Sequence, residues 1–414
     1  MTLRFATAMR RATKLTRQAR KARRVRAGKA RTAAMAFQSA IGGAMVTTAM
    51  APFSNLSAGT QAKPKPRKAA GKTKAASVRK RASPVTPRRD RRLSIVLSQL
   101  RAAKAMMPSP VLLSGPASPS KSPVIPAGAQ YLERTHSCST GARDFSLYLP
   151  ASQPDGPKGL IVMLHGCTQD PNDFATGTDM NAIAQKHGLA VAYPAQTSGH
   201  NAANCWNWFA PSDQSRGGGE PAVIASLARA LMVEFSLERT AVFVAGLSAG
   251  GAMAVILADT YPDVFSAAGV HSGLPRGSAN NVLSAMSAMR DGGQAPALSS
   301  VTRSRAAAIP DRDMRRIIFH GDADSTVHPS NASQIVVAVV GDREPAQVSP
   351  KSASGRVYVQ SDYALPNGTI DVELWQVEGA GHAWSGGKAG GTYTDPKGPD
   401  ASSEMVRFFL AGTA

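Results

Sequence analysis

The sequence predicts an α/β protein whose mostly parallel sheet carries helices on both faces. Two features of residues 131–414 support this fold class. Short apolar runs alternate with longer segments of helical pattern, and one apolar run passes through a glycine-rich turn directly into a helix. Apolar strands that are separated by helices are typical of βαβ units, in which both faces of the sheet are covered. We therefore expect one doubly wound domain with no internal repeat.

The expected elements follow one another along the chain. Apolar runs of strand length predict strands over residues 159–165, 189–193, 241–245, 265–271, 316–320 and 372–377. Helical patterns predict helices over residues 179–187, 220–235, 249–259 and 402–410. No strongly apolar run reaches the length of about 18 residues that a membrane span needs, so no transmembrane span is expected.

Charge divides the 414 residues into two parts. Residues 1–120 hold 27 Lys and Arg against one acid, Asp90, and carry a net charge of +26, whereas residues 121–414 carry −5. The stretch 63–92 is rich in Lys, Arg and Pro and cannot bury enough apolar surface to offset its chain entropy, so it should be disordered. A short amphipathic helix at 94–107 and a Pro/Ser-rich linker should follow. The predicted organisation is a basic, largely disordered N-terminal segment at 1–120 and a globular domain at 121–414.

The strongest local signal is the segment Gly246-Leu-Ser248-Ala-Gly250. It follows the predicted strand at 241–245 and opens a helix near Ala249. A serine on a sharp turn from strand to helix stands clear of the sheet, and the flanking glycines let strand and helix pass without Cβ clashes. The alternative is a glycine-rich turn that only packs tightly. The strand before the turn and the helix after it favour Ser248 as a catalytic nucleophile.

A serine hydroxyl needs a general base, and the base needs an orienting carboxylate. In α/β-hydrolases these partners follow the serine, first Asp or Glu and then His, on loops after later strands. His382 lies in a glycine-rich loop after the strand at 372–377, and Asp322 and Asp324 follow the strand at 316–320. We predict His382 as the base and Asp324 as its partner, with Asp322 as the competing acid. A solvated loop residue is the alternative for each of them.

The oxyanion hole needs a second backbone N–H from the loop after an earlier strand. The segment Leu164-His-Gly-Cys-Thr-Gln169 ends the first predicted strand in the expected place. We predict the N–H groups of Cys167 and Ala249 as the donors, with Thr168 as the alternative to Cys167. His165 precedes the nucleophile and lies at the strand end, so we expect it to be structural.

Seven short segments form one pattern that runs in order through the globular part: HGCTQ at 165–169, NCWNWF at 204–209, GGE at 218–220, GLSAGGAM at 246–253, YPD at 261–263, HSG at 271–273 and GHAW at 381–384. This pattern resembles the poly(3-hydroxybutyrate) depolymerase family of esterases, whose relatives include feruloyl and acetylxylan esterases. The resemblance implies an α/β-hydrolase without a metal or an organic cofactor. It maps the catalytic triad onto Ser248, Asp324 and His382.

The resemblance also implies a disulfide between Cys167 and Cys205, which would tie the oxyanion loop to the Trp-rich loop at 204–209. Cys138 has no evident partner and is expected to be a plain buried thiol. The aromatic residues of the Trp-rich loop are either core anchors or, as the resemblance suggests, walls that bind the acyl or aromatic part of a substrate: Trp206, Trp208 and Phe209.

These observations predict a serine esterase for carboxylic esters of the poly- or oligo-3-hydroxybutyrate type. A feruloyl- or acetylxylan-type esterase is the first alternative. The chain ends 32 residues after His382, which leaves no room for a separate polymer-binding domain and favours soluble oligomers, amorphous granules or small esters. The alternative from another class is a polyanion- or granule-binding protein in which the basic segment carries the main role.

The basic segment has three interpretations of equal weight. An apolar stretch at 33–51 between basic blocks resembles an export signal. Alternatively, residues 1–110 bind DNA, RNA or an anionic granule surface non-specifically, with an affinity that falls as salt rises. The third interpretation is a functionally minor extension or a mis-assigned start. Localisation stays open between secretion, which the family habit and the disulfide slightly favour, and a cytoplasmic protein associated with granules or the nucleoid.

Overall fold

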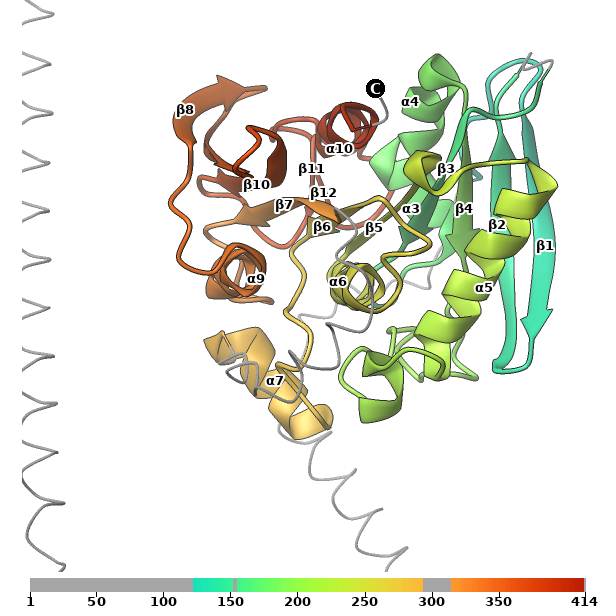
Figure 1. Ribbon diagram of the computed structural model, residues 1–414, viewed down its shortest axis with the longest axis horizontal. Coiled ribbons are helices and arrows are strands. Elements are labelled where there is room, and N and C mark those ends of the chain that lie inside the picture. Colours follow the sequence, from blue (N-terminus) through green and yellow to red (C-terminus); the bar gives the residue numbers. More distant parts are fainter. Residues whose placement is uncertain (1–121, 152–154, 293–313, 413–414) are drawn as a thin grey trace, which may run out of the picture. The chain divides into compact units, whose positions relative to one another are not determined.

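The computed structural model describes residues 122–151, 155–292 and 314–412 (Figure 1). The basic segment and the helix expected at 94–107 lie outside these residues. The strands are β1 (Gln130–Cys138), β2 (Gly141–Leu149), β3 (Gly159–Leu164), β4 (Leu189–Pro194), β5 (Val242–Leu247), β6 (Ala267–His271), β7 (Arg315–Gly321), β8 (Gln347–Ala353), β9 (Arg356–Ala364), β10 (Ile370–Val377), β11 (Trp384–Ser385) and β12 (Thr394–Asp395).

Ten of these strands form one sheet in the order β1-β2-β4-β3-β5-β6-β7-β10-β9-β8. The strands β4, β3, β5, β6, β7 and β10 run parallel, and the pairs at both ends of the sheet are antiparallel. The predicted α/β-hydrolase fold with a mostly parallel sheet is confirmed. Because the six parallel strands end at the same edge, the loops that follow them are brought together there.

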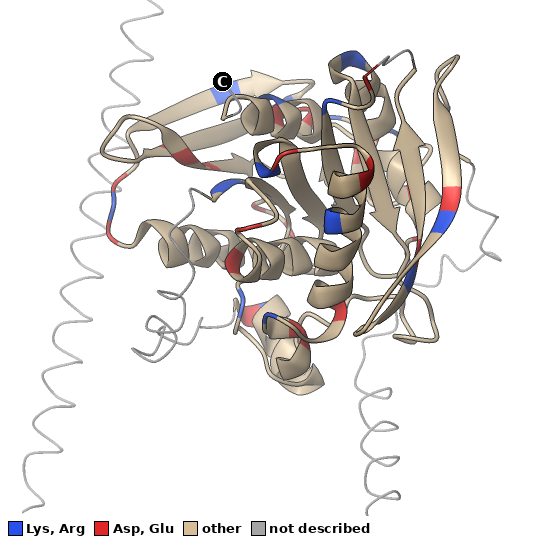
Figure 2. Cartoon of the chain, turned by 45° about the vertical axis from the view of Figure 1, so that its right-hand side comes forward, with Lys and Arg blue, Asp and Glu red and all other residues tan. Residues whose placement is uncertain are grey.

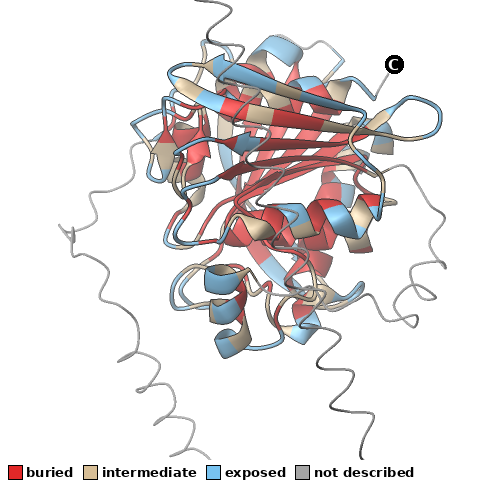
Figure 3. Ribbon diagram, turned by 90° about the vertical axis from the view of Figure 1, so that its left-hand side faces the viewer, coloured by how far each residue is buried: buried red, intermediate tan, exposed pale blue. Residues whose placement is uncertain are grey.

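Helices cover both faces of the sheet (Figures 1 and 3). One face carries α5 (Gly219–Glu234), α6 (Ala249–Thr260) and α9 (Ser330–Val340), and the other carries α3 (Pro171–Thr178), α4 (Met180–His187) and α10 (Ala401–Leu410). Helix α7 (Val282–Asp291) follows β6, and two short 3₁₀ segments lie at Pro211–Gln214 and Arg239–Ala241. The adjacent β3 residues Ile161 and Val162 are fully buried in different core clusters, as the two-residue period of a strand requires.

Within the described residues, all the strands and helices that the sequence predicts are present. The structure adds the antiparallel strands β1, β2, β8 and β9, the short pair β11 and β12, and the helices α3, α7 and α9. Strand β8 has no fully buried residue and no apolar run, because it lies at the edge of the sheet. In the part of the chain that the structure describes, no helix is both long enough and apolar enough to cross a bilayer.

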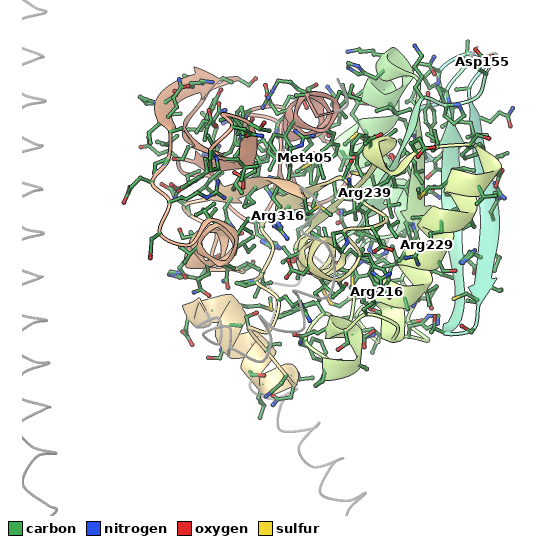
Figure 4. The ribbon with its side chains drawn as sticks, viewed as in Figure 1. Asp155, Arg216, Arg229, Arg239, Arg316 and Met405 are labelled. Atoms are coloured by element: carbon green, nitrogen blue, oxygen red, sulfur yellow. A yellow bond between two sulfur atoms is a disulfide. The ribbon has the colours of Figure 1, made fainter. Side chains whose placement is uncertain are left out.

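Acidic and basic side chains are scattered over the described domain (Figures 2 and 4). A cluster of ion pairs surrounds Asp263. Arg216 and Arg229 both donate to Asp263, at 2.5 and 2.8 Å. Both guanidinium groups also lie over the ring of Tyr261, 4.8 and 5.6 Å from its centroid. The hydrogen bond from Arg216 is the main reason why the pKa of Asp263 lies far below its usual range. The Tyr-Pro-Asp segment at 261–263 is therefore a structural corner after α6.

Helix α10 packs against the centre of the sheet. A Cβ at Gly269 of β6 would lie 2.5 Å from the sulfur of Met405, so only glycine leaves room for this side chain (Figure 4). Arg315 of β7 is buried and donates to the carbonyl oxygens of Phe408 and Phe409, both at 2.8 Å. The last carbonyls of a helix have no partner inside the helix. Arg315 therefore donates hydrogen bonds to two of these unpaired carbonyls at the end of α10 and joins this helix to β7.

Candidate active site

Ser248 stands on the turn between β5 and α6. Its backbone has φ 58° and ψ −118°, a strained conformation of the kind that gathers at functional sites. The neighbouring glycines are required by a close approach of backbones. A Cβ at Gly250 would lie 2.6 Å from the carbonyl carbon of Leu164 and closer still to its oxygen, and a Cβ at Gly246 would lie 2.8 Å from the same oxygen. The expected strand–serine–helix turn is thus present.

His382 and Asp324 meet on the loops after β10 and β7. His382 Nδ1 lies 2.8 Å from Asp324 Oδ2, and because a carboxylate only accepts, Nδ1–H is the donor. The other carboxylate oxygen accepts the N–H groups of Thr326 and Val327, both at 2.9 Å. The Asp324 side chain has no exposed surface, whereas that of His382 is 11% exposed. The carboxylate is therefore fixed through both oxygens, and the second ring nitrogen of His382 has no partner among the described residues.

Asp322, the competing acid, has a different position. Its side chain is exposed, and Oδ1 accepts the N–H of Gly379 at 2.6 Å. The next N–H, from Ala323, donates to the carbonyl of Ala380 at 3.1 Å. These bonds hold the loops after β7 and β10 together from the outside. Only Asp324 of the two acids contacts the His382 imidazole.

A second imidazole lies against Asp324. His320 is buried near the end of β7, and its Nε2 lies 2.8 Å from the carbonyl oxygen of Val327 and 3.5 Å from Asp324 Oδ2. Because both of these groups accept, Nε2 carries the hydrogen. Burial acts to raise the pKa of Asp324, but the hydrogen bonds from His320 and His382 outweigh it and lower this pKa well below its usual range. The two imidazoles therefore favour the ionised form of the Asp324 carboxyl.

His271 connects the serine turn to the loop that carries His382. Its carbonyl accepts the N–H of Ser248 at 2.9 Å, and its Nε2 accepts the N–H of Ser385 at 3.0 Å. Burial, together with the neighbouring imidazoles, lowers the pKa of His271 to about 3, so the ring stays neutral and can accept. Ser248 and His382 are not hydrogen-bonded to each other in the described structure. Their loops are held together through His271.

The oxyanion loop follows β3 and runs beside the serine. A Cβ at Gly166 would lie 3.6 Å from the Cβ of Ser248. The N–H of Thr168, the alternative donor, is already bonded to a backbone carbonyl at 2.8 Å. Within the described residues, the N–H groups of Cys167 and Ala249 have no protein acceptor. These two predicted donors are therefore the ones available to a ligand.

The disulfide between Cys167 and Cys205 is present, as the family resemblance implied, with Cα atoms 4.2 Å apart. It ties the oxyanion loop to the Trp-rich loop at 204–209. Cys138 is a free thiol, in agreement with its lack of an evident partner, but it is half-buried rather than fully buried. Its sulfur lies 3.1 Å from the hydroxyl of Thr140. Cys138 ends β1, the edge strand, where one side of the chain faces solvent.

The aromatic residues of the Trp-rich loop are mainly core anchors. Trp206 is fully buried, and its indole N–H donates to the carbonyl of His165 at 3.1 Å. The guanidinium of Arg143 lies 5.6 Å from the Trp206 ring. Trp208 is 5% exposed, and Phe209 is half-buried against the same core cluster. The burial of Trp206 and Trp208 favours the interpretation as core anchors, and a substrate-wall role for the Trp-rich loop stays a prediction.

His165 has the environment expected of a structural residue. It is buried, its Nε2 accepts the N–H of Gln196 at 3.1 Å, and its Nδ1–H donates to the carbonyl of Gly166 at 2.8 Å. Burial lowers its pKa, which keeps the ring neutral. The Gln196 side chain continues the network to the buried carboxylate of Glu220, which also accepts the N–H of Asn207 at 2.7 Å. This network holds the Trp-rich loop through the backbone N–H of Asn207.

Two residues that lie beside the predicted triad were not predicted from the sequence. The sequence held a signal for His320, because it is the last residue of the predicted apolar strand at 316–320 and lies four positions before Asp324. Tyr393 had none, because it lies in a polar, glycine-rich loop between β11 and β12. Its ring is edge-on to His382, with centroids 6.5 Å apart and planes at 79°.

Comparison with known proteins adds independent support for this family. Residues 143–342 match the family model described as Esterase PHB depolymerase. The resemblance to this esterase family is confirmed. The matched range contains Ser248, Asp324 and the oxyanion loop, whereas His382 lies beyond its end.

Curated relatives agree with the family match. The chain is 33% identical to poly(3-hydroxyalkanoate) depolymerase C of Paucimonas lemoignei over 250 residues, which are 60% of this chain and 57% of that protein. It is 30% identical to a probable acetylxylan esterase A of Aspergillus fumigatus over 193 residues, 45% of this chain and 51% of the relative. The chain thus spans about half the length of the curated relatives it matches.

A solved structure agrees with the fold. The acetyl xylan esterase from Aspergillus awamori superposes with a TM-score of 0.55 and 20% sequence identity, over 69% of this chain and 99% of that one. At this identity the similarity speaks for the α/β-hydrolase fold alone.

Proposed function

We propose that this protein is a serine esterase in which Ser248 is the nucleophile, His382 the general base and Asp324 the orienting acid. The observation that carries the proposal is the contact of 2.8 Å between His382 Nδ1 and the buried, ionised carboxylate of Asp324. This contact fixes the tautomer, so that His382 Nε2 is an acceptor. Ester hydrolysis requires a base of this kind together with a nucleophilic serine, and the strained turn of Ser248 is tied through His271 to the loop that carries His382.

In this mechanism Ser248 Oγ attacks the ester carbonyl carbon while His382 Nε2 takes the hydroxyl proton. The carbonyl oxygen becomes an oxyanion, and the free N–H groups of Cys167 and Ala249 stabilise it. The C–O bond to the alcohol then breaks, and His382 returns the proton to the leaving alkoxide. Water, activated by His382, hydrolyses the acyl-enzyme and restores Ser248. Asp324 stays ionised throughout and stabilises the imidazolium.

The substrate class that we propose is an oligomeric or polymeric 3-hydroxyalkanoate ester, and an acetyl or feruloyl ester of plant polysaccharide is the alternative. The first relative named above is called a poly(3-hydroxyalkanoate) depolymerase and the second a probable acetylxylan esterase. Rates on hydroxybutyrate oligomers, acetylated xylan and methyl ferulate decide between them. If kcat/KM is higher on both acetylated xylan and methyl ferulate than on the hydroxybutyrate oligomers, the polysaccharide esters become the preferred substrate class.

We further propose that the chain is organised as a basic segment at 1–120 and an esterase domain at 121–414. The basic segment, with its charge of +26, is then a separate polyanion- or granule-binding arm. A protein whose main role is that binding, with an inert hydrolase domain, is the competing proposal. Ester turnover by residues 121–414 alone, at the rate of the full chain, supports an active esterase domain.

The direct test of the proposal is Ser248→Ala. We expect the rate on a p-nitrophenyl ester to fall by about 10⁴-fold or more, as when one member of a serine triad is removed. Ser236→Ala is a matched control, because Ser236 also has a positive φ, of 54°, but is exposed at the end of α5. Retention of more than about a tenth of the rate by Ser248→Ala, at unchanged melting temperature, would refute the assignment.

A further inference from the structure

Tyr393 combines an exposed aromatic ring with a strained backbone. Its side chain is 45% exposed, and its φ of 51° lies in the left-handed region that a tyrosine rarely adopts. The chain on both sides holds it there. The N–H of Trp384 donates to the Tyr393 carbonyl at 2.7 Å, and the N–H of Thr392 donates to Asp173 at 2.8 Å. Strain that the surroundings impose in this way is typical of ligand-binding positions.

The Tyr393 side chain reaches from the imidazole to the oxyanion loop. Its ring is edge-on to His382, and its hydroxyl lies 3.2 Å from the hydroxyl of Thr168. The Thr168 hydroxyl itself donates to the carbonyl of Cys167 at 2.5 Å. Since the Thr168 proton is used in that bond, the Tyr393 hydroxyl is the donor to Thr168. Tyr393 thus contacts both halves of the machinery that the proposed function uses.

The position beside the base determines which part of an ester the ring meets. In the hydrolysis proposed above, His382 returns its proton to the leaving alkoxide, so the alcohol portion of the ester departs next to the imidazole. An exposed aromatic ring at this place presents an apolar surface to that portion, and rings of this kind favour planar or apolar partners.

We propose that Tyr393 is a specificity-determining residue that contacts the alcohol portion of the ester, and that its hydroxyl fixes the oxyanion loop through Thr168. This inference rests on the proposed function. Tyr393 favours esters with planar or apolar alcohol portions over esters of small alcohols, and other residues determine the choice of acyl group.

The first experiment compares two ratios of kcat/KM in the full chain. The alcohol ratio is 2-naphthyl acetate over methyl acetate, and the acyl ratio is p-nitrophenyl butyrate over p-nitrophenyl acetate. In Tyr393→Ala we expect the alcohol ratio to fall about 3- to 10-fold, the effect of one lost aromatic contact, while the acyl ratio changes less than about twofold. Tyr393→Phe keeps the ring and should keep the alcohol ratio. Val233→Ala, which removes an exposed apolar side chain from α5, should change neither ratio.

The second experiment separates the role of the Tyr393 hydroxyl from that of its strained backbone. Tyr393→Phe should lower kcat on methyl acetate, and Thr168→Val should lower it at least as much, because it also removes the bond to the Cys167 carbonyl. The double variant should lose no more than Thr168→Val alone, because the contact between the two hydroxyls is already broken in that variant. Tyr393→Gly should lose the alcohol ratio as Tyr393→Ala does, yet melt about 2–4 °C higher than Tyr393→Ala, since glycine tolerates a positive φ. A merely structural residue would not show lost selectivity together with raised stability.

An unchanged alcohol ratio in Tyr393→Ala, or a change confined to the acyl ratio, would overturn the inference. Additive losses in the double variant would overturn the role of the Thr168 contact. These failures differ from failure of the proposed function, in which the wild-type chain and every variant would hydrolyse none of the four esters.

Discussion

The closest backbone approach beside Ser248 leads to a quantitative prediction for Gly250→Ala. Gly250 lies in the first turn of α6, and its missing Cβ would stand 2.6 Å from the carbonyl carbon of Leu164 and 2.7 Å from the carbonyl oxygen of His165. Ordinary contact begins at about 3.4 Å, so α6 and the end of β3 must separate by at least about 0.8 Å, because the Leu164 oxygen lies closer still than its carbon. Both neighbours are backbone atoms in a buried parallel sheet, which cannot turn aside as a side chain does.

Overpacking of this kind lowers the unfolding free energy by about 1–3 kcal/mol. Because both contacting segments are rigid backbone, we expect the cost in Gly250→Ala to be at or above the upper value. The better helix propensity of alanine returns at most about 1 kcal/mol. The net loss of about 2 kcal/mol corresponds to a melting temperature lower by about 4–8 °C for a domain of this size. Since a displacement of about 1 Å at a catalytic group costs about 100-fold in rate, we expect kcat to fall by that factor in protein that is still folded.

Circular dichroism melting and p-nitrophenyl acetate turnover on the same sample measure both effects. Gly199→Ala is the matched control, because a Cβ at Gly199 would meet only the hydroxyl of Thr197, at 3.7 Å. A Gly250→Ala protein with an unchanged or higher melting temperature, and with a rate within about twofold of wild type, would refute the reasoning, because propensity alone predicts that outcome.

Four further predictions concern the acids of the site, the disulfide and the basic segment. Asp324→Asn should lower kcat by about 10³- to 10⁴-fold, whereas Asp322→Asn should cost less than about tenfold, and the reverse order would transfer the role to Asp322. The pKa of Asp324 is lower in the folded state than in the unfolded state, so this carboxylate stabilises the fold fully above the unfolded pKa of about 4, and the stabilisation is lost as pH falls. The unfolding free energy of Asp324→Asn, measured by urea titration, should therefore fall less steeply than that of wild type between about pH 5 and 2. Cys205→Ser, which opens a loop with a sequence separation of 38, should lose about 3–4 kcal/mol of unfolding free energy, and a non-reduced digest of wild type should contain the linked Cys167 peptide. The full chain should bind duplex DNA with an affinity that falls steeply with salt while residues 121–414 do not bind, and binding that is insensitive to salt would contradict an electrostatic arm.

The sequence predicted the parallel core of the fold because its strands are apolar on both faces. Strand β3, for example, is buried at every residue and reads as an unbroken apolar run. The antiparallel strands at the sheet ends lack this signal, since β8 is open to solvent and rich in polar residues. Pattern recognition thus finds strands that two layers of helices cover and misses those at the edges.

The same distinction applies to the site. Ser248, Asp324 and His382 follow buried strands, so their approach to one edge of the sheet was predictable. Tyr393 was not, because a loop between β11 and β12 brings it to the imidazole and tertiary bonds fix its backbone. The burial of Trp206 was equally hidden, since an aromatic residue in a loop has the same sequence signal whether it faces the core or a groove.

The bonds between Arg315 and the end of α10 have a consequence for truncations within this helix. Gly412 lies against this guanidinium, where a Cβ would be 2.6 Å from its Nε. Trimming that stops at Ala411 leaves both carbonyl acceptors, on Phe408 and Phe409, in place. Trimming by one more helical turn removes them and leaves a buried cation without acceptors on β7, the strand that leads to Asp324. A variant that lacks the last turn of α10 is therefore expected to be destabilised at β7, the strand that precedes the acid of the site.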